Sequence, residues 1–162
     1  MKRFKRSKKK GPVTAKVVSY DGITFASGLE KYMYVALEAA GIETRYEGEV
    51  FELVEGFHFN NKCTERQSNG KGGYVNRGEK KVLNIKYTPD FVSYDYIIET
   101  KGRANEAFPM RWKLFKRLLS LRKDLRDVYK PQNQSECDET VRLILKQRND
   151  IKYEQKKLKL NE

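Results

Sequence analysis

Cysteine, proline and histidine are scarce in this sequence, and long apolar runs are absent. Its 162 residues include two cysteines, four prolines and one histidine. Cys63 and Cys137 are far apart and match no metal-ligand spacing, so we expect free thiols in a reducing cytoplasm. No segment approaches the roughly 20 apolar residues that span a bilayer, which argues against a membrane protein. The basic first residues precede no apolar signal-peptide core, which again predicts a cytoplasmic protein.

Acidic side chains are outnumbered by basic ones. The chain has 34 lysines and arginines against 22 aspartates and glutamates, a formal net charge of +12. Such an excess attracts polyanions, chiefly nucleic acid, although it also attracts anionic membranes and aids solubility. Residues 1–12 carry seven basic side chains and no acidic one. We expect a disordered segment here, whose charges, Lys8, Lys9 and Lys10 among them, contact DNA phosphates independently of sequence.

Hydrophobic periodicity predicts a small α/β domain with a mixed sheet flanked by helices. Apolar stripes predict a helix at 27–41, a second at 110–125 and a C-terminal helix from residue 138. Strands are expected at 46–54, 82–94, 96–102 and 126–132, and residues 93–95 join two of them into an antiparallel hairpin. We place the main domain at 13–145 and a basic helical tail at 146–162.

A polar, glycine-rich segment at 55–81 interrupts this pattern. A connection of such length in a compact domain is usually functional or disordered. We interpret it as a long hairpin loop or an inserted flap, in part extended. Its basic side chains are predicted to contact the DNA backbone: Lys62, Arg66, Lys71, Arg77, Lys80 and Lys81.

Charged residues stand within the otherwise apolar, aromatic stretch YTPDFVSYDYIIETKG, residues 87–102. Side chains alternate along a strand, so Glu99 and Lys101 point to the same side. The hairpin brings Asp90 beside the end of the second strand, near Glu99. At about 4 Å and an effective dielectric near 20, two carboxylates repel by about 4 kcal/mol, and a bound divalent cation removes that cost. The alternative is a surface ion pair at a sheet edge, which is common and contributes little.

This arrangement suits hydrolysis of a phosphodiester. Asp90 and Glu99 are predicted to bind Mg²⁺ or Mn²⁺, with the backbone carbonyl of Thr100 as a further ligand. A metal ion lowers the pKa of bound water, and the Lys101 ammonium can position that water or stabilise charge on phosphate oxygens. Arg103, just beyond this cluster, is predicted to contact a phosphate.

The residues TPDF and IIETKG resemble the core of the PD-(D/E)xK nuclease superfamily, with Asp90, Glu99 and Lys101 in the motif positions. The stretch FASGLEKYMYVALEAAGIETRYE, residues 25–47, resembles the first helix and strand of phage endonuclease I, a family of Holliday-junction resolvases. Together the resemblance covers roughly residues 25–121 and implies a restriction-endonuclease-like fold. It also implies a catalytic role for Glu30, at a second metal or the attacking water. The residues alone indicate a helix cap, because Glu30 follows Ser27 at capping-box spacing.

The resemblance therefore implies a metal-dependent phage endonuclease, most specifically a resolvase of branched, four-way DNA junctions. Paired cuts in a two-fold symmetric junction require a homodimer, and the family's dimer is domain-swapped. The 55–81 segment is longer than the corresponding connection in the family, so the sequence does not decide whether a dimer of this protein is domain-swapped. The alternatives are a nicking or non-specific phage nuclease in recombination, repair or packaging, and a non-catalytic nucleic-acid-binding protein of the same fold. His58, the single histidine, cannot build a histidine-based nuclease site on its own.

Overall fold

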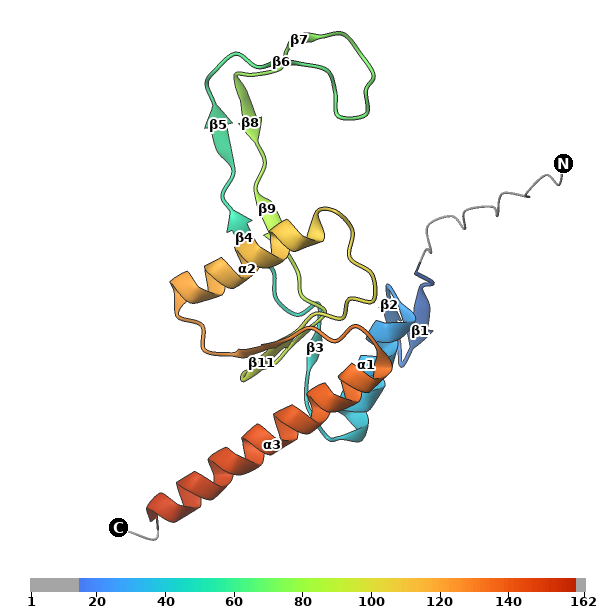
Figure 1. Cartoon of the computed structure of the whole chain (residues 1–162), viewed down its shortest axis with the longest axis vertical. Helices are drawn as coiled ribbons and strands as arrows, with labels where there is room; N and C mark the ends of the chain where they lie inside the picture. Colours follow the sequence, from blue (N-terminus) through green and yellow to red (C-terminus); the bar gives the residue numbers. More distant parts are fainter. Residues whose placement is uncertain (1–14, 160–162) are drawn as a thin grey trace, which may run out of the picture. The chain divides into compact units, whose positions relative to one another are not determined.

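The computed structural model describes residues 15–159, which form three helices and twelve short strands (Figure 1). The predicted mixed α/β composition is confirmed. The chain divides into two compact units, one comprising residues up to Glu43 and from Pro131 on, the other Thr44–Lys130. The basic N-terminal segment 1–12, with Lys8, Lys9 and Lys10, lies outside the described residues. Between residues 15 and 159, no helix is long and apolar enough to cross a membrane.

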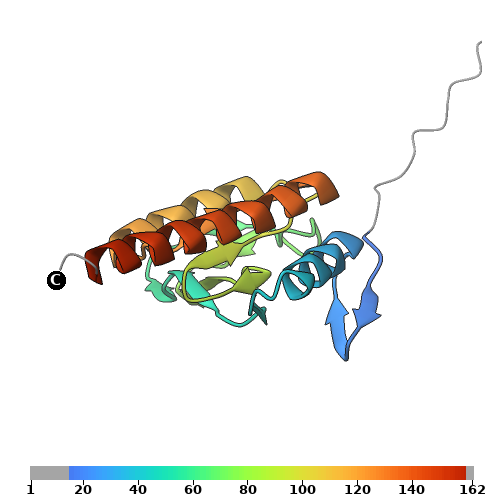
Figure 2. The ribbon, with the colours of Figure 1, turned by 90° about the horizontal axis from the view of Figure 1, so that it is seen from below.

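The first unit joins a small hairpin to two helices. Strands β1 (Val18–Tyr20) and β2 (Ile23–Phe25) pair antiparallel around a turn, where Asp21 and Gly22 have φ of 49° and 72°. Helix α1 (Gly28–Ala39) packs against α3 (Gln134–Lys159), and Figure 2 shows α3 extending well past the end of α1. The predicted stripe of α1 is confirmed, because Met33 and Leu37 are fully buried.

Helix α3 begins earlier than the sequence predicted, at Gln134 instead of Asp138. Asn133 explains the difference, because its side-chain oxygen accepts a hydrogen bond from the backbone N–H of Glu136 at 3.0 Å. The Glu136 carboxylate in turn accepts from the Asn133 side chain and from the Gln132 backbone. These contacts satisfy N–H groups that the first turn of a helix otherwise leaves unpaired.

A four-stranded mixed sheet forms the centre of the second unit. Its order is β12 (Asp127–Tyr129), β11 (Tyr96–Ile98), β10 (Phe91–Val92) and β3 (Arg45–Tyr46). The predicted hairpin is confirmed, since β10 and β11 pair antiparallel with Phe91 opposite Ile98. Strands β11 and β12 are parallel, and parallel neighbours need a crossover connection. Helix α2 (Phe108–Arg122) supplies it, so its first turn follows closely on the end of β11.

All four predicted strands are wrong in their extent: those expected at 96–102 and 126–132 are shortened to β11 and β12, and the other two are interrupted. The strand expected at 46–54 is split into β3 and β4 (Phe51–Val54), because Glu47 takes a left-handed φ of 47° and turns the chain. The Glu47 N–H donates to the carbonyl of Asp90 at 2.8 Å, which fixes that turn against β10. The strand expected at 82–94 is interrupted by Pro89, which lacks an N–H for a ladder; β9 (Ile85–Tyr87) precedes it and β10 follows.

The core of the second unit lies between α2 and the strands. Strand β4 pairs antiparallel with β9, and α2 packs on β4. Phe115 of α2 is fully buried, with its ring centroid 4.9 Å from that of Phe51 and 4.7 Å from that of Tyr87. The remaining buried members of this cluster are Leu53, Val92, Ile97, Phe108 and Leu119. Aromatic pairs of this kind add to the stability gained from burial alone.

The segment predicted as a hairpin or flap forms a β-arm, defined here as residues 56–83, which extends from β4 and β9 away from α2 (Figure 1). Strands β5 (Phe57–Phe59) and β8 (Lys80–Val82) pair antiparallel, and β6 (Thr64–Glu65) pairs with β7 (Val75–Asn76) nearer the tip. The extended character of the segment is therefore confirmed.

The two ladders of the β-arm meet at a specific junction. The side-chain oxygen of Asn76 accepts from the N–H groups of Cys63 and Gly78, each at 3.0 Å. A Cβ atom on Gly78 would lie 2.0 Å from the carbonyl oxygen of Asn61, so no other residue fits there without moving the backbone. The β-arm is thus a built element and not an irregular loop.

Candidate active site

The predicted acidic pair lies at one end of the β10–β11 hairpin. Asp90 directly precedes β10 and Glu99 directly follows β11, and the neighbouring residues Phe91 and Ile98 are paired. The backbone of Glu99 is also held from the other side, because its N–H donates to the carbonyl of Tyr129 at 3.0 Å. The central position of β11 therefore fixes Glu99 between two neighbouring strands.

Asp90 is oriented by Thr100. One carboxylate oxygen, Oδ2, accepts hydrogen bonds from both the backbone N–H and the side-chain hydroxyl of Thr100, each at 2.6 Å. Thr100 is itself buried, so these contacts exchange little with water. Two donors on one oxygen stabilise the ionised carboxylate and hold its orientation.

Glu99 and Lys101, which the spacing placed on the same side, form an ion pair. Lys101 Nζ lies 3.3 Å from Glu99 Oε1, and the Glu99 side chain is only 4% exposed against 31% for Lys101. The same ammonium lies 4.9 Å from the ring centroid of Phe108, the first residue of α2. The Lys101 side chain is thus held between a buried carboxylate and an aromatic face.

An aromatic wall, defined as Tyr87, Phe108, Trp112 and Phe115, lies behind this ion pair. The rings of Phe108 and Trp112 stack with their centroids 5.8 Å apart, and the ring centroids of Trp112 and Tyr87 are 6.3 Å apart. Burial raises the pKa of the Tyr87 phenol, and the charges of Glu99 and Asp90 raise it further. Both carboxylates therefore act on the same phenol, which stays protonated and can donate a hydrogen bond to a carboxylate.

Glu30 belongs to the first unit, where it caps α1. Its Oε1 accepts from the Ser27 hydroxyl at 2.8 Å and its Oε2 accepts from the Ala26 N–H at 2.9 Å. The Glu30 N–H donates back to the Ser27 side chain at 3.2 Å, which completes the predicted capping box. These contacts bear out the capping role, whereas the catalytic role that the family resemblance implied stays a prediction.

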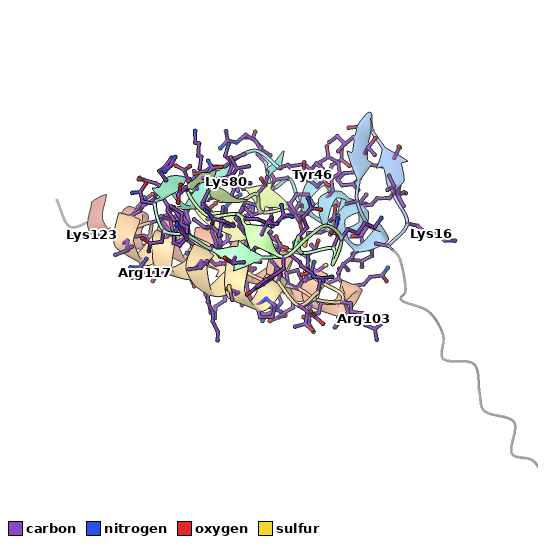
Figure 3. The ribbon with its side chains drawn as sticks, turned by 90° about the horizontal axis from the view of Figure 1, so that it is seen from above. Lys16, Tyr46, Lys80, Arg103, Arg117 and Lys123 are labelled. Carbon is purple, nitrogen blue, oxygen red and sulfur yellow. The ribbon has the colours of Figure 1, made fainter. Side chains whose placement is uncertain are left out.

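The predicted DNA contacts of the second unit are largely exposed cations. Along the β-arm, the exposed ones are Lys62, Arg66, Lys71, Lys80 and Lys81. Arg77 is half-buried, because its Nε donates to the backbone carbonyl of Glu65 at 3.3 Å. Arg103 is exposed in the loop between β11 and α2, and Figure 3 labels it together with Lys80 of the β-arm and Arg117 of α2.

The donor set at the hairpin end is compatible with magnesium or manganese. Two carboxylates, Asp90 and Glu99, with Lys101 beside them leave one net negative formal charge on a chain of net charge +12. Mg²⁺ is commonly held by one or two carboxylates, with waters and substrate phosphates completing its shell. Within residues 15–159 no cluster of three or more His, Cys, Asp or Glu side chains could hold a metal ion, so oxygen ligands from Thr100, water and substrate would be required.

Several residues of this site were not predicted from the sequence. The sequence predicts a role for the Thr100 carbonyl but none for its hydroxyl, and it assigns no role at the site to Tyr87 or Trp112. Phe108 was placed before the second helix, which begins two residues earlier than expected. The available signal was the i, i+4 spacing of Phe108 and Trp112, which puts both rings on one face of a helix.

Comparison with known proteins gives one family. Residues 8–130 match the model of the family described as Protein of unknown function (DUF1064), and this match ends at the last residue of the second unit. No curated protein matches the chain, and no solved structure matches it. Since the match covers more than half of its length, the chain belongs to the DUF1064 family.

Proposed function

We propose that this protein is a metal-dependent DNA endonuclease with a restriction-endonuclease-like core. The observation that carries the proposal is the convergence of Asp90, Glu99 and Lys101 at one end of a hairpin, with Glu99 buried and ion-paired. A buried carboxylate beside a second carboxylate is costly unless it binds a cation or has some other function. The phage endonuclease I resemblance makes branched DNA the leading substrate and a homodimer the leading assembly.

Each residue has a separate role in this proposal. Asp90 and Glu99 hold Mg²⁺ or Mn²⁺ with the Thr100 carbonyl, while Thr100 also orients Asp90 through the two hydrogen bonds described above. A bound cation supplies Lewis-acid stabilisation of the phosphate and a more acidic water. Lys101, partly exposed between Glu99 and Phe108, presents its ammonium to the attacking water and to the phosphate oxygens.

A surface ion pair is the competing explanation for Glu99 and Lys101. It accounts less well for the 4% exposure of Glu99, because ion pairs without a function are mostly exposed and contribute little. It also does not involve the second carboxylate, Asp90, which Thr100 holds at the same end of the hairpin. Both observations favour a site that receives a further positive charge.

The test of this function is a cleavage assay on three labelled substrates: a four-way junction, a linear duplex and a single strand, each with Mg²⁺, Mn²⁺ or EDTA. We expect metal-dependent cuts placed symmetrically in the junction. Cuts in all three substrates would retain the nuclease and replace the resolvase by a non-specific or nicking enzyme. Tight binding without cleavage in either metal would reject catalysis in favour of a nucleic-acid-binding protein.

The β-arm is proposed to supply affinity for the DNA backbone. Changing Lys80 and Lys81 together to glutamine is expected to weaken duplex binding and to make its salt dependence shallower by about 1.8, because each phosphate contact contributes a slope of about 0.9. Both side chains are exposed, so the fold should be unaffected. Titrations by fluorescence anisotropy at several salt concentrations measure this slope. Lys146→Gln with Lys152→Gln on α3 is the control for lost charge, and an equal effect of both pairs would contradict a specific role of the β-arm.

A further inference from the structure

The hydroxyl group of Tyr87 is enclosed by protein and has no satisfactory hydrogen bond. Tyr87 is 7% exposed, and its Oη is one of two buried polar side-chain atoms without a partner in the described part of the chain. Burial raises the pKa of the Tyr87 phenol most, and the charge of the Glu99 carboxylate and a weak side-chain contact with it raise this pKa further. That contact does not reach the distance and angle of a formed hydrogen bond. The Tyr87 hydroxyl, a hydrogen-bond donor, is therefore placed near Glu99 without a formed hydrogen bond to it.

Packing alone does not account for this hydroxyl. The ring centroid of Tyr87 lies 4.7 Å from that of Phe115 and 6.3 Å from that of Trp112. A phenylalanine ring at position 87 would pack against the same two rings. A buried hydroxyl without a partner destabilises the fold, so phenylalanine at this position is neutral or stabilising for packing. Unsatisfied buried polar groups in folded proteins often mark a functional site or the place of a water or ion.

We propose that Tyr87 is a positioning residue for the metal site, whose hydroxyl donates a hydrogen bond to Glu99 once this carboxylate binds a divalent cation. In the structure, Oε1 of Glu99 faces the Lys101 ammonium at 3.3 Å. A small reorientation of the carboxylate toward a cation improves its geometry with the Tyr87 donor. Hydrogen bonds of this kind hold metal ligands in place and commonly change metal affinity by about 10- to 100-fold.

The aromatic wall makes Tyr87 suitable for this role. Its ring is fixed by Trp112 and Phe115 of α2, so the hydroxyl has little freedom to turn away from Glu99. Lys101 is held by Phe108 of the same helix. Helix α2 thereby supports both the ammonium and the phenol that flank Glu99, one through Phe108 and the other through Trp112 and Phe115.

This inference rests on the proposed metal-dependent function and is tested by metal affinity, not by cleavage. Tyr87→Phe removes the hydroxyl and keeps the ring. We expect its Mn²⁺ affinity, measured by isothermal titration calorimetry without DNA, to fall about 10-fold. We expect the denaturation midpoint of the metal-free variant, followed by the fluorescence of the single tryptophan, Trp112, to be equal to or higher than that of the wild type.

The matched control is Tyr32→Phe, which removes a hydroxyl that donates to Asp138 at 2.9 Å within the first unit. It is expected to leave Mn²⁺ affinity unchanged. Equal Mn²⁺ affinity of Tyr87→Phe and wild type would overturn the positioning role. A lowered midpoint of metal-free Tyr87→Phe would also overturn it, because the hydroxyl would then be bonded before metal binds. A wild-type protein that binds no Mn²⁺ would reject the metal-dependent function itself, a result distinct from the other two.

Discussion

Asp90→Asn is expected to lower metal-dependent cleavage of DNA by on the order of a thousand-fold, because a catalytic cation stabilises the transition state by several kcal/mol and about 1.4 kcal/mol changes a rate tenfold. The asparagine side chain keeps an oxygen that can accept from the Thr100 N–H and hydroxyl. The fold around β10 should therefore persist while the negative charge at the metal is lost.

The matched control for this variant is Asp127→Asn, the same chemical change at an exposed position of β12 in the same unit. Single-turnover cleavage with Mg²⁺ should be near the wild-type rate in the control. Mn²⁺ binding by calorimetry should be weakened only in Asp90→Asn. If Asp90→Asn cleaved as fast as the control, the metal site would have to lie elsewhere in the chain.

Phe115→Ala is expected to reduce the free energy of unfolding of the second unit by about 3–5 kcal/mol, as is typical for a buried phenylalanine replaced by alanine. Phe115 is fully buried and its ring contacts those of Phe51, Tyr87 and Trp112. The cavity would lie directly behind the residues that support Glu99 and Lys101. Chemical denaturation followed by Trp112 fluorescence reports on this unit, since Trp112 lies within it.

The control for lost packing is Leu125→Ala, because Leu125 is 93% exposed in the same unit. Its effect on the free energy of unfolding should stay within about 0.5 kcal/mol. A loss below about 1 kcal/mol for Phe115→Ala would contradict the assignment of Phe115 to the core, since truncation of a buried phenylalanine to alanine typically costs about 3–5 kcal/mol. Far-UV circular dichroism shows whether α2 persists in the variant.

Local signals in the sequence predicted local structure well. The capping box of Ser27 and Glu30 and the left-handed Gly41, with φ of 64°, correctly placed both ends of α1. Glu99 and Lys101 lie close together, as expected from their spacing, although β11 ends at Ile98, and the hairpin followed from residues 93–95. Each of these features depends on residues only a few positions apart, where side-chain geometry is set by the backbone period.

Features that depend on distant residues were not predictable in the same way. The left-handed turn at Glu47 has no glycine to signal it, and it is fixed by the carbonyl of Asp90, more than forty residues away in sequence. The aromatic wall depends on how α2 crosses from β11 to β12, which no local pattern specifies. For the same reason, Tyr87 gave no sign that its hydroxyl would face Glu99.

The parallel pairing of β11 with β12 has a consequence for the order in which the protein is made. Asp90, Glu99 and Lys101 are all synthesised by residue 101, but the Glu99 N–H is held by the carbonyl of Tyr129, and the rings behind the site belong to α2. A nascent chain therefore carries every one of these three side chains before it can hold them in place. The Glu99 backbone gains this contact only when β12 has left the ribosome, so a chain released between residues 102 and 126 lacks the strand that holds it.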